Sequence, residues 1–385
     1  MKFKIKDFKI KENFGRIFVG GPKFLPPPGG IVSHSDFMKS YEICKNKFSD
    51  DDNNIVKIIS DSMSETGRLP FDLLPQEIAF IENNKLSVWC DYLVFRYKMR
   101  FYQKQKKVSD FPVYLLIEPT SACNLRCVMC FQCDTSFTKK PYMGVMSLDF
   151  FKKVIDEAVA GGTKAITLAS RGEPTLNKNI GEMLKYTKDK FFEVKVNTNG
   201  TKLTEKICHE ILDSGVTELV WSIDAPKKDL YEKIRVRGNF DVVIKNILMF
   251  NSIREKHYPN SKLKTTASGV MFHEEQDIDE FNNFFGTISD NVAAQKIENR
   301  WNTYINEKRP DITSPCEYLW ERMYVWFDGI CNPCDVDYKS FLTVGNINES
   351  SIKEIWHGET YTKLRTDHKN KERSKWNPCD RCGLS

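Results

Sequence analysis

The sequence predicts an α/β fold in which six β/α units form an open sheet, a partial (β/α)6 barrel. Between residues 113 and 300, apolar strand-like segments alternate with segments of helical periodicity. Several of the strand-like segments are apolar, as in parallel strands that helices cover. The alternation gives six units, which are too few for a closed eight-stranded barrel. In such a sheet, the side chains that do chemistry lie beyond the carboxyl ends of the strands.

Each strand candidate is short and mostly apolar, and most are separated by a helical pattern. The six strand candidates are residues 113–120, 164–169, 193–197, 218–223, 262–272 and 292–297. The helical patterns occupy residues 147–160, 180–190, 204–214 and 241–256. The first helix has Ser147 as a candidate N-cap, and Gly161 and Gly162 as its stop signal.

The barrel core, residues 111–300, has an extension on each side. Residues 1–110 form an N-terminal extension of mixed structure, with a possible hairpin over residues 3–20 and a long helix over about residues 75–107. That helix is rich in aromatic residues and Leu, which favours packing against the barrel over binding a partner. Residues 301–385 form a small C-terminal domain that contains five cysteines.

Composition and charge exclude several classes of protein. The 385 residues include 41% apolar residues, enough for a large core, so a disordered chain is excluded. The net charge of +5 is spread along the chain and gives no argument for binding nucleic acid. Apolar runs are far shorter than a membrane span, and the N-terminal residues lack the apolar segment of an export signal. We therefore expect a cytoplasmic protein without a membrane partner.

Nine of the twelve cysteines form two groups, and the first group follows the first predicted strand. In it, Cys123, Cys127 and Cys130 are separated by three and then two residues. Zinc sites prefer pairs of cysteines from two places, whereas three ligands on one loop suit a 4Fe–4S cluster with one open iron. Cys133 could close that cluster as a fourth ligand. The isolated Cys44, Cys90 and Cys208 are most simply buried apolar residues.

The Cys-x3-Cys-x2-Cys spacing, with later motifs at successive strand ends, resembles the radical S-adenosylmethionine (SAM) superfamily over about residues 113–300. The resemblance implies that Cys123, Cys127 and Cys130 bind a 4Fe–4S cluster whose open iron chelates SAM. It also implies that an electron cleaves SAM to methionine and a 5′-deoxyadenosyl radical, which removes a hydrogen atom from the substrate. A flavodoxin or ferredoxin-type protein would supply the electron.

The same resemblance assigns SAM contacts to polar residues at the strand ends. By this resemblance Gly172 and Glu173 hold the amino group, and Arg235 pairs with the methionine carboxylate. The other implied contacts are Met129, Asn197, Thr198, Asn199, Ser222, Asp224, Gly269 and Val270. Arg171 stands where the family has a glycine, so we expect it to face the substrate. Each motif also has a simpler interpretation, as a turn, a helix cap or a surface charge.

The second group, Cys316, Cys331, Cys334, Cys379 and Cys382, resembles the C-terminal SPASM or twitch extension of radical SAM enzymes. The resemblance implies one auxiliary 4Fe–4S cluster held by Cys316, Cys334, Cys379 and Cys382. Four thiolates would close this cluster and suit it to electron transfer. Cys331 would be a spare ligand or a hydrogen-atom donor. A structural zinc site is the alternative for this domain.

Together the two clusters favour a radical SAM oxidoreductase. We expect it to oxidise an alcohol of a sugar or aminocyclitol-like small molecule, with the auxiliary cluster as electron acceptor. The alternatives are a maturase that cross-links or epimerises a ribosomally made peptide, and a sugar epimerase that uses a cysteine donor. An iron–sulfur scaffold without catalysis is also open. The candidate substrate contacts are Arg171, Tyr304, Asp335, Asp337 and Tyr338, and the two aspartates are either bases or caps of a local turn.

Overall fold

The computed structural model describes residues 31–296, 303–309 and 311–382, and its contacts divide the chain into two units. One unit is helical and ends at Val108, and the other begins at Ser109 and holds the sheet. The predicted hairpin over residues 3–20 lies outside the described residues. No described helix has the length and apolarity that a membrane crossing requires.

The described part of the helical unit contains four α-helices, whose apolar faces form a core around residues such as Phe37, Ile59 and Leu93. The helices are α1 (His34–Cys44), α2 (Asp50–Thr66), α3 (Pro75–Asn83) and α4 (Trp89–Gln105). The prediction of one helix over residues 75–107 is therefore wrong. The side chains of Asn83 and Asn84 donate to carbonyl oxygens four residues back, and this competition ends α3 before α4 begins.

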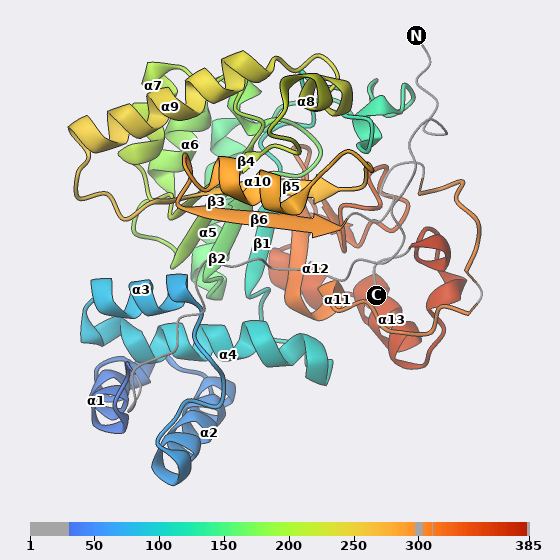
Figure 1. Cartoon of the computed structure of the whole chain (residues 1–385). Coiled ribbons are helices and arrows are strands. Elements are labelled where there is room, and N and C mark those ends of the chain that lie inside the picture. The colour runs from blue at the N-terminus through green and yellow to red at the C-terminus, as the bar shows by residue number, and fades with distance from the viewer. Residues whose placement is uncertain (1–30, 297–302, 310, 383–385) are drawn as a thin grey trace. The chain divides into compact units, whose positions relative to one another are not determined.

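All six predicted strands are present, and they pair in parallel in chain order (Figure 1). They are β1 (Tyr114–Ile117), β2 (Ala165–Leu168), β3 (Glu193–Thr198), β4 (Glu218–Ser222), β5 (Lys264–Met271) and β6 (Asn291–Lys296). The sheet is not closed, because its order runs from β6 through β1 into the C-terminal domain. This confirms the predicted partial barrel.

Six α-helices connect these strands, two more than the sequence patterns predict. They are α5 (Leu148–Gly161), α6 (Ile180–Tyr186), α7 (Glu205–Leu212), α8 (Lys228–Ile234), α9 (Phe240–His257) and α10 (Ile278–Phe285). The helices α8 and α10 are only two turns long, which explains why no period was recognised. Ser147 caps α5 as predicted, since its hydroxyl accepts a hydrogen bond from the amide of Phe150.

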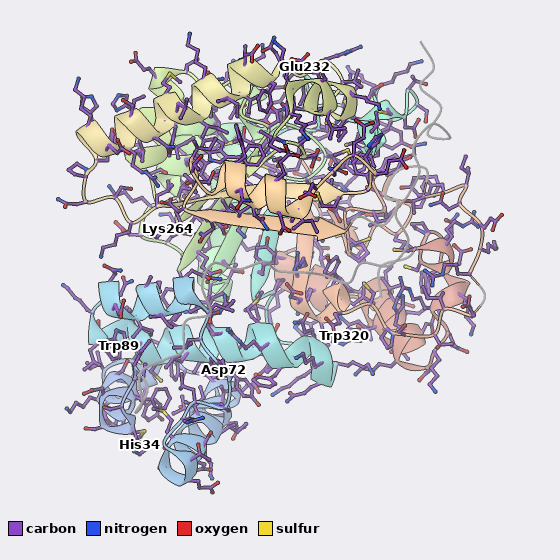
Figure 2. The ribbon with its side chains drawn as sticks, viewed as in Figure 1. His34, Asp72, Trp89, Glu232, Lys264 and Trp320 are labelled. Atoms are coloured by element: carbon purple, nitrogen blue, oxygen red, sulfur yellow. The ribbon has the colours of Figure 1, made fainter. Side chains whose placement is uncertain are left out.

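The C-terminal domain continues the sheet rather than standing apart from it. Strand β7 (Arg322–Val325) pairs in parallel with β1, and β8 (Ile330–Asn332) and β9 (Gly345–Asn346) follow in antiparallel order. Helices α11 (Tyr318–Glu321), α12 (Ile352–His357) and α13 (Glu359–Lys369) complete the domain. Buried tryptophans form its core, among them Trp320 on α11 (Figure 2). The nine-stranded sheet thus brings both cysteine groups into one unit.

Candidate active site

The first cysteine group lies on the loop that leaves β1. Cys127 is buried, whereas Cys123 and Cys130 are half-buried. Backbone amides point at two of the sulfurs: Leu125 donates to Cys123 Sγ at 3.4 Å and Gln132 donates to Cys130 Sγ at 3.5 Å. Such donors stabilise negative charge on a sulfur atom.

Burial raises the pKa of all three predicted ligands, that of Cys127 to about 12. The thiols are therefore protonated at neutral pH unless a cationic metal centre deprotonates them. One buried and two half-buried cysteines, two of which receive amide hydrogen bonds, are a donor set that fits an iron–sulfur cluster. In the part of the chain that the structure describes, no three Cys, His, Asp or Glu side chains are grouped to hold a single metal ion.

Cys133 already has a hydrogen-bonding role within the loop. Its thiol donates to the carbonyl oxygen of Cys127 at 3.1 Å and reaches that of Arg126 at 3.5 Å. This orientation favours a role in holding the loop over one as a fourth ligand. Met129 lies between two predicted ligands and is half-buried.

Glu173 forms the centre of a buried polar network beyond β2. Its carboxylate accepts hydrogen bonds from the amides of Thr175 and Asn199 and from the hydroxyls of Thr175 and Thr198, all within 3.1 Å. Burial raises the pKa of Glu173, and no described cation forms an ion pair with it. A buried carboxylate without a cation is complementary to a positively charged ligand group.

Gly172 permits the close approach of the loops after β1 and β2. A Cβ atom at this position would lie 2.2 Å from the carbonyl oxygen of Thr120 and 2.5 Å from that of Ala122. Both are backbone atoms, so a larger residue cannot be accommodated without moving a loop. The amide of Glu173 donates to the same Ala122 carbonyl at 2.8 Å. The predicted need for a glycine here therefore has a steric basis.

The motif at the end of β3 connects this network to the first cysteine group. Asn199 donates from Nδ2 to Asn124 at 3.1 Å and contacts Cys123 Sγ at 3.9 Å. Gly200 has a φ of +73°, so the motif is also a turn, as its simpler interpretation holds. The buried Oδ1 atom of Asn197 has no hydrogen-bond partner among the described residues. The ends of β2 and β3 thus meet at Cys123.

The ends of β4 and β5 bring Asp224 and Arg235 together. Arg235 donates from Nε to one Asp224 oxygen at 2.7 Å, and the amide of Val270 donates to the other at 3.0 Å. Both charged side chains are buried, so Arg235 is not a surface charge. Ser222 ends β4 and is half-buried. Beside it, Gly269 leaves no room for a Cβ atom, which would lie 2.9 Å from the carbonyl oxygen of Ile223.

Arg171 forms a buried ion pair that the sequence did not reveal. Its guanidinium donates two hydrogen bonds to the carboxylate of Glu118, each at 2.7 Å, and a third to the carbonyl oxygen of Tyr338 at 2.9 Å. It also lies 4.2 Å from the ring centre of Trp326. With these partners Arg171 is placed to hold three segments together. Glu118 was missed, although a charged residue at the end of an apolar strand was a usable signal.

Four cysteines of the second group lie close together. Cys316, Cys334, Cys379 and Cys382 line one pocket, together with Arg373. Burial raises the pKa of each of the first three, that of Cys316 to about 11, and Arg373 counteracts this for Cys316 and Cys379. Four half-buried cysteines that line one pocket beside a guanidinium are a donor set that fits a closed iron–sulfur cluster.

Cys331 does not line this pocket. It lies on β8, is fully buried, and its thiol contacts the carbonyl oxygen of Gly329 at 3.7 Å. Its position favours a packing role over both roles that the sequence left open, which are a spare ligand and a hydrogen-atom donor.

The two aspartates after Cys334 differ in their surroundings. The carboxylate of Asp337 is fully buried and accepts four hydrogen bonds, from two amides, the Asn332 side chain and the hydroxyl of Tyr304. This set fits the turn-capping interpretation, which the sequence left open beside a role as a base. Asp335 is half-buried.

Comparison with known proteins agrees with this geometry. Residues 117–285 match the radical SAM superfamily, and residues 316–383 match SPASM, an iron–sulfur cluster-binding domain. The chain therefore contains a radical SAM domain followed by a C-terminal SPASM domain. These domains imply a SAM-binding 4Fe–4S cluster and auxiliary cluster chemistry, and the two cysteine groups described above are the donor sets that fit them.

Among similar proteins is a tungsten-containing aldehyde ferredoxin oxidoreductase cofactor-modifying protein of Pyrococcus furiosus. It is 36% identical over an alignment that covers 29% of this chain and 30% of that protein. Another is an AdoMet-dependent heme synthase of Methanosarcina barkeri, 28% identical over 57% of this chain and 59% of that protein. The chain therefore spans less than two thirds of the length of either relative. The crystal structure of Streptococcus suis SuiB bound to the precursor peptide SuiA matches over 91% of this chain and 86% of its own, with a TM-score of 0.55. At 16% identity, this likeness concerns the fold alone.

Proposed function

We propose that this enzyme catalyses a net oxidation of its substrate after hydrogen-atom abstraction, with the C-terminal cluster as electron acceptor. The observation that carries the proposal is the convergence of Cys316, Cys334, Cys379 and Cys382 on one pocket. Four protein thiolates leave no open iron for a substrate, so this site is suited to electron transfer. The substrate class we propose is an alcohol of a sugar or aminocyclitol-like molecule.

The residues of the core would bind and orient SAM. Cys123, Cys127 and Cys130 would hold the first cluster, and Glu173 would accept from the ammonium group of SAM. The paired Asp224 and Arg235 offer a polar surface beside them. When bound, the clusters and SAM supply the hydrogen-atom abstraction and the removal of the remaining electron.

The remaining proton of an oxidised alcohol needs a base. Asp337 already accepts four hydrogen bonds, so it supports the turn, and Asp335 is the better candidate of the two. The buried rings of Phe131, Phe137 and Tyr338 pack against Cys130 and would exclude water from this side of the cluster.

Maturation of a peptide is the second candidate. It is supported by the likeness in fold to SuiB, whose structure holds a precursor peptide and which matches most of the chain. Cross-linking of a peptide is also a net oxidation and would use the same closed cluster. Epimerisation with Cys331 as donor has less support, because that thiol is fully buried away from the cysteine-lined pocket.

The test is product analysis with the anaerobically reconstituted enzyme, SAM and a reductant. Sugars, aminocyclitols and candidate precursor peptides are supplied in parallel, and deoxyadenosine and product mass are measured. Oxidation predicts deoxyadenosine together with a product about two mass units lighter. A product of unchanged mass that takes up solvent deuterium would contradict oxidation and favour epimerisation. A variant with Cys379→Ser should still cleave SAM but should lose the oxidised product.

A further inference from the structure

The loop that carries Cys130 continues into a segment that the C-terminal domain holds in place. Phe131 and Phe137 follow the cysteine and are buried against Tyr338, whose ring stacks on Phe131 with 4.8 Å between centroids. Cys130 itself packs against this aromatic cluster. The ring of Tyr338 therefore lies directly behind the last predicted ligand of the first cluster.

Polar contacts reinforce this stack. The hydroxyl of Tyr338 donates to the carboxylate of Asp134 at 2.9 Å. Lys339 forms an ion pair with the same carboxylate at 2.6 Å and donates to Ser136 at 2.8 Å. Only 17% of the Lys339 side chain is exposed, so this pair is shielded more than an ordinary surface pair. Two adjacent residues thus hold the loop by a ring, a hydroxyl and a charge.

Tyr338 is in turn fixed from the side of the second cysteine group. It follows Cys334 by four residues, and its carbonyl oxygen accepts the hydrogen bond from Arg171. The Arg171 guanidinium contacts the rings of Phe137 and Trp326, at 5.5 and 4.2 Å from their centres. Cys334 packs against the cluster of Leu116, Tyr324 and Trp326. Continuous packing therefore joins Cys130 to Cys334.

The backbone conformation of the residue before Arg171 is strained, so holding Arg171 in place costs conformational free energy. Ser170 has a φ of +101°, a region that residues with a side chain rarely adopt. Such strain persists only where surrounding contacts over-determine the conformation. The bidentate pair with Glu118 and the hydrogen bond to Tyr338 are contacts of that kind.

We infer that Tyr338 and Lys339 are positioning residues that make SAM binding at the first cluster depend on the state of the second cluster site. This inference rests on one part of the proposed function, which is that each of the two cysteine groups binds a cluster. The physical reason is that continuous packing joins Cys334, which would bind the second cluster, to the segment that holds the Cys130 loop, so a change at the second cluster site would reach that loop. Coupling of this kind is carried by packed elements with two arrangements, and it is reciprocal.

The experiment measures SAM affinity by titration of the reduced first cluster, followed by its electron paramagnetic resonance signal. Tyr338→Leu should weaken SAM binding about fivefold or more and change the signal, whereas Tyr338→Phe, which keeps the ring, should stay within about twofold of the parent. The matched control is Tyr102→Leu in the helical unit. That buried tyrosine also donates to an aspartate, Asp51, which pairs with Lys107, and its loss should leave the signal unchanged.

A double-mutant cycle tests the coupling itself. Cys379→Ser should weaken SAM binding about fivefold in the parent but should add little in the Tyr338→Leu background. The inference would be overturned if the losses of SAM affinity caused by the two substitutions multiplied in the double variant. It would also be overturned if Tyr338→Leu kept the signal and the SAM affinity of the parent. If Tyr338→Leu loses all iron, the same measurements on Lys339→Met test the inference. Its control is Lys363→Met, which breaks another lysine–aspartate pair in that domain. Failure of the parent protein to cleave SAM would instead refute the proposed function.

Discussion

At the scale of single residues, the site depends on buried charges whose partners lie far away in the sequence. Arg171 pairs with Glu118 and Arg235 pairs with Asp224, and all four side chains are buried. Glu173 is different, since it has hydrogen bonds but no described cation. This difference supports the proposal that Glu173 accepts a cationic ligand group.

Removing the charge of Glu173 should therefore weaken SAM binding. We expect Glu173→Gln to lower the affinity about tenfold or more, because a hydrogen bond to a charged group contributes roughly 1.5–3 kcal/mol. Equilibrium titration of the reconstituted protein measures this. The exposed Glu182→Gln on α6 is the control and should bind SAM as the parent does. An unchanged affinity in Glu173→Gln would contradict the assignment.

The pH dependence of SAM binding should reflect the same carboxylate. Burial raises the pKa of Glu173 above the ordinary value of 4.5, and protonation removes its negative charge. Affinity should therefore be full above the raised pKa and should fall as the pH drops through it, beginning at a higher pH than an exposed glutamate would allow. Titrations across a pH series measure this, and the Glu173→Gln protein should lack that component.

The two cysteines on either side of Asn332 and Pro333 should behave oppositely. Cys334 lines the second pocket and Cys331 does not, so Cys334→Ser should lose the iron of that site, about four atoms, whereas Cys331→Ser should keep it. Iron analysis after anaerobic reconstitution compares the two. If only Cys331→Ser lost iron, Cys331 rather than Cys334 would be the ligand.

At the scale of elements, the strand ends form the site because neighbouring loops approach closely. Gly172 is the clearest case, since the backbone carbonyls of Thr120 and Ala122 lie where its Cβ atom would be. The loops after β1, β2 and β3 are consequently one packed layer. A change in any of them should be transmitted to Cys123.

Adding a methyl group at Gly172 should separate these loops. We expect Gly172→Ala to destabilise the protein by about 1–3 kcal/mol, as overpacking does, and to lower iron binding at the first site. Chemical denaturation and iron analysis measure the two effects. The control, Gly67→Ala, has open space but a φ of +70°, so it should cost roughly 1–2 kcal/mol without loss of iron.

The sequence predicted the elements with a strong local signal and missed those that depend on distant partners. The apolar β1 to β6 were recognisable from composition, and Ser147 from its capping position. The short α8 and α10 gave too little periodicity, and the break at Asn84 was hidden by the aromatic pattern around it. The cysteine spacing indicated the residues that we propose as donor sets, whereas the pair of Arg171 with Glu118 required the fold.

At the scale of the whole molecule, the two cysteine groups should contribute separately to the iron content. The parent protein should hold about eight iron atoms, from two four-iron clusters. Replacing Cys123, Cys127 and Cys130 together by alanine should remove about half of the iron and all cleavage of SAM. Iron analysis and deoxyadenosine formation measure this. Full deoxyadenosine formation in that variant would contradict the site assignment.

The parallel pairing of β7 with β1 has a consequence for how the two domains can be studied. A shortened chain that ends before residue 322 would remove β7 from beside β1 and leave the amides and carbonyls on that side of β1 without ladder partners. Bare strand edges recruit other chains, so such a truncation should aggregate. Loss of activity on deletion would then report insolubility rather than a missing electron acceptor, and point substitutions are the sounder approach.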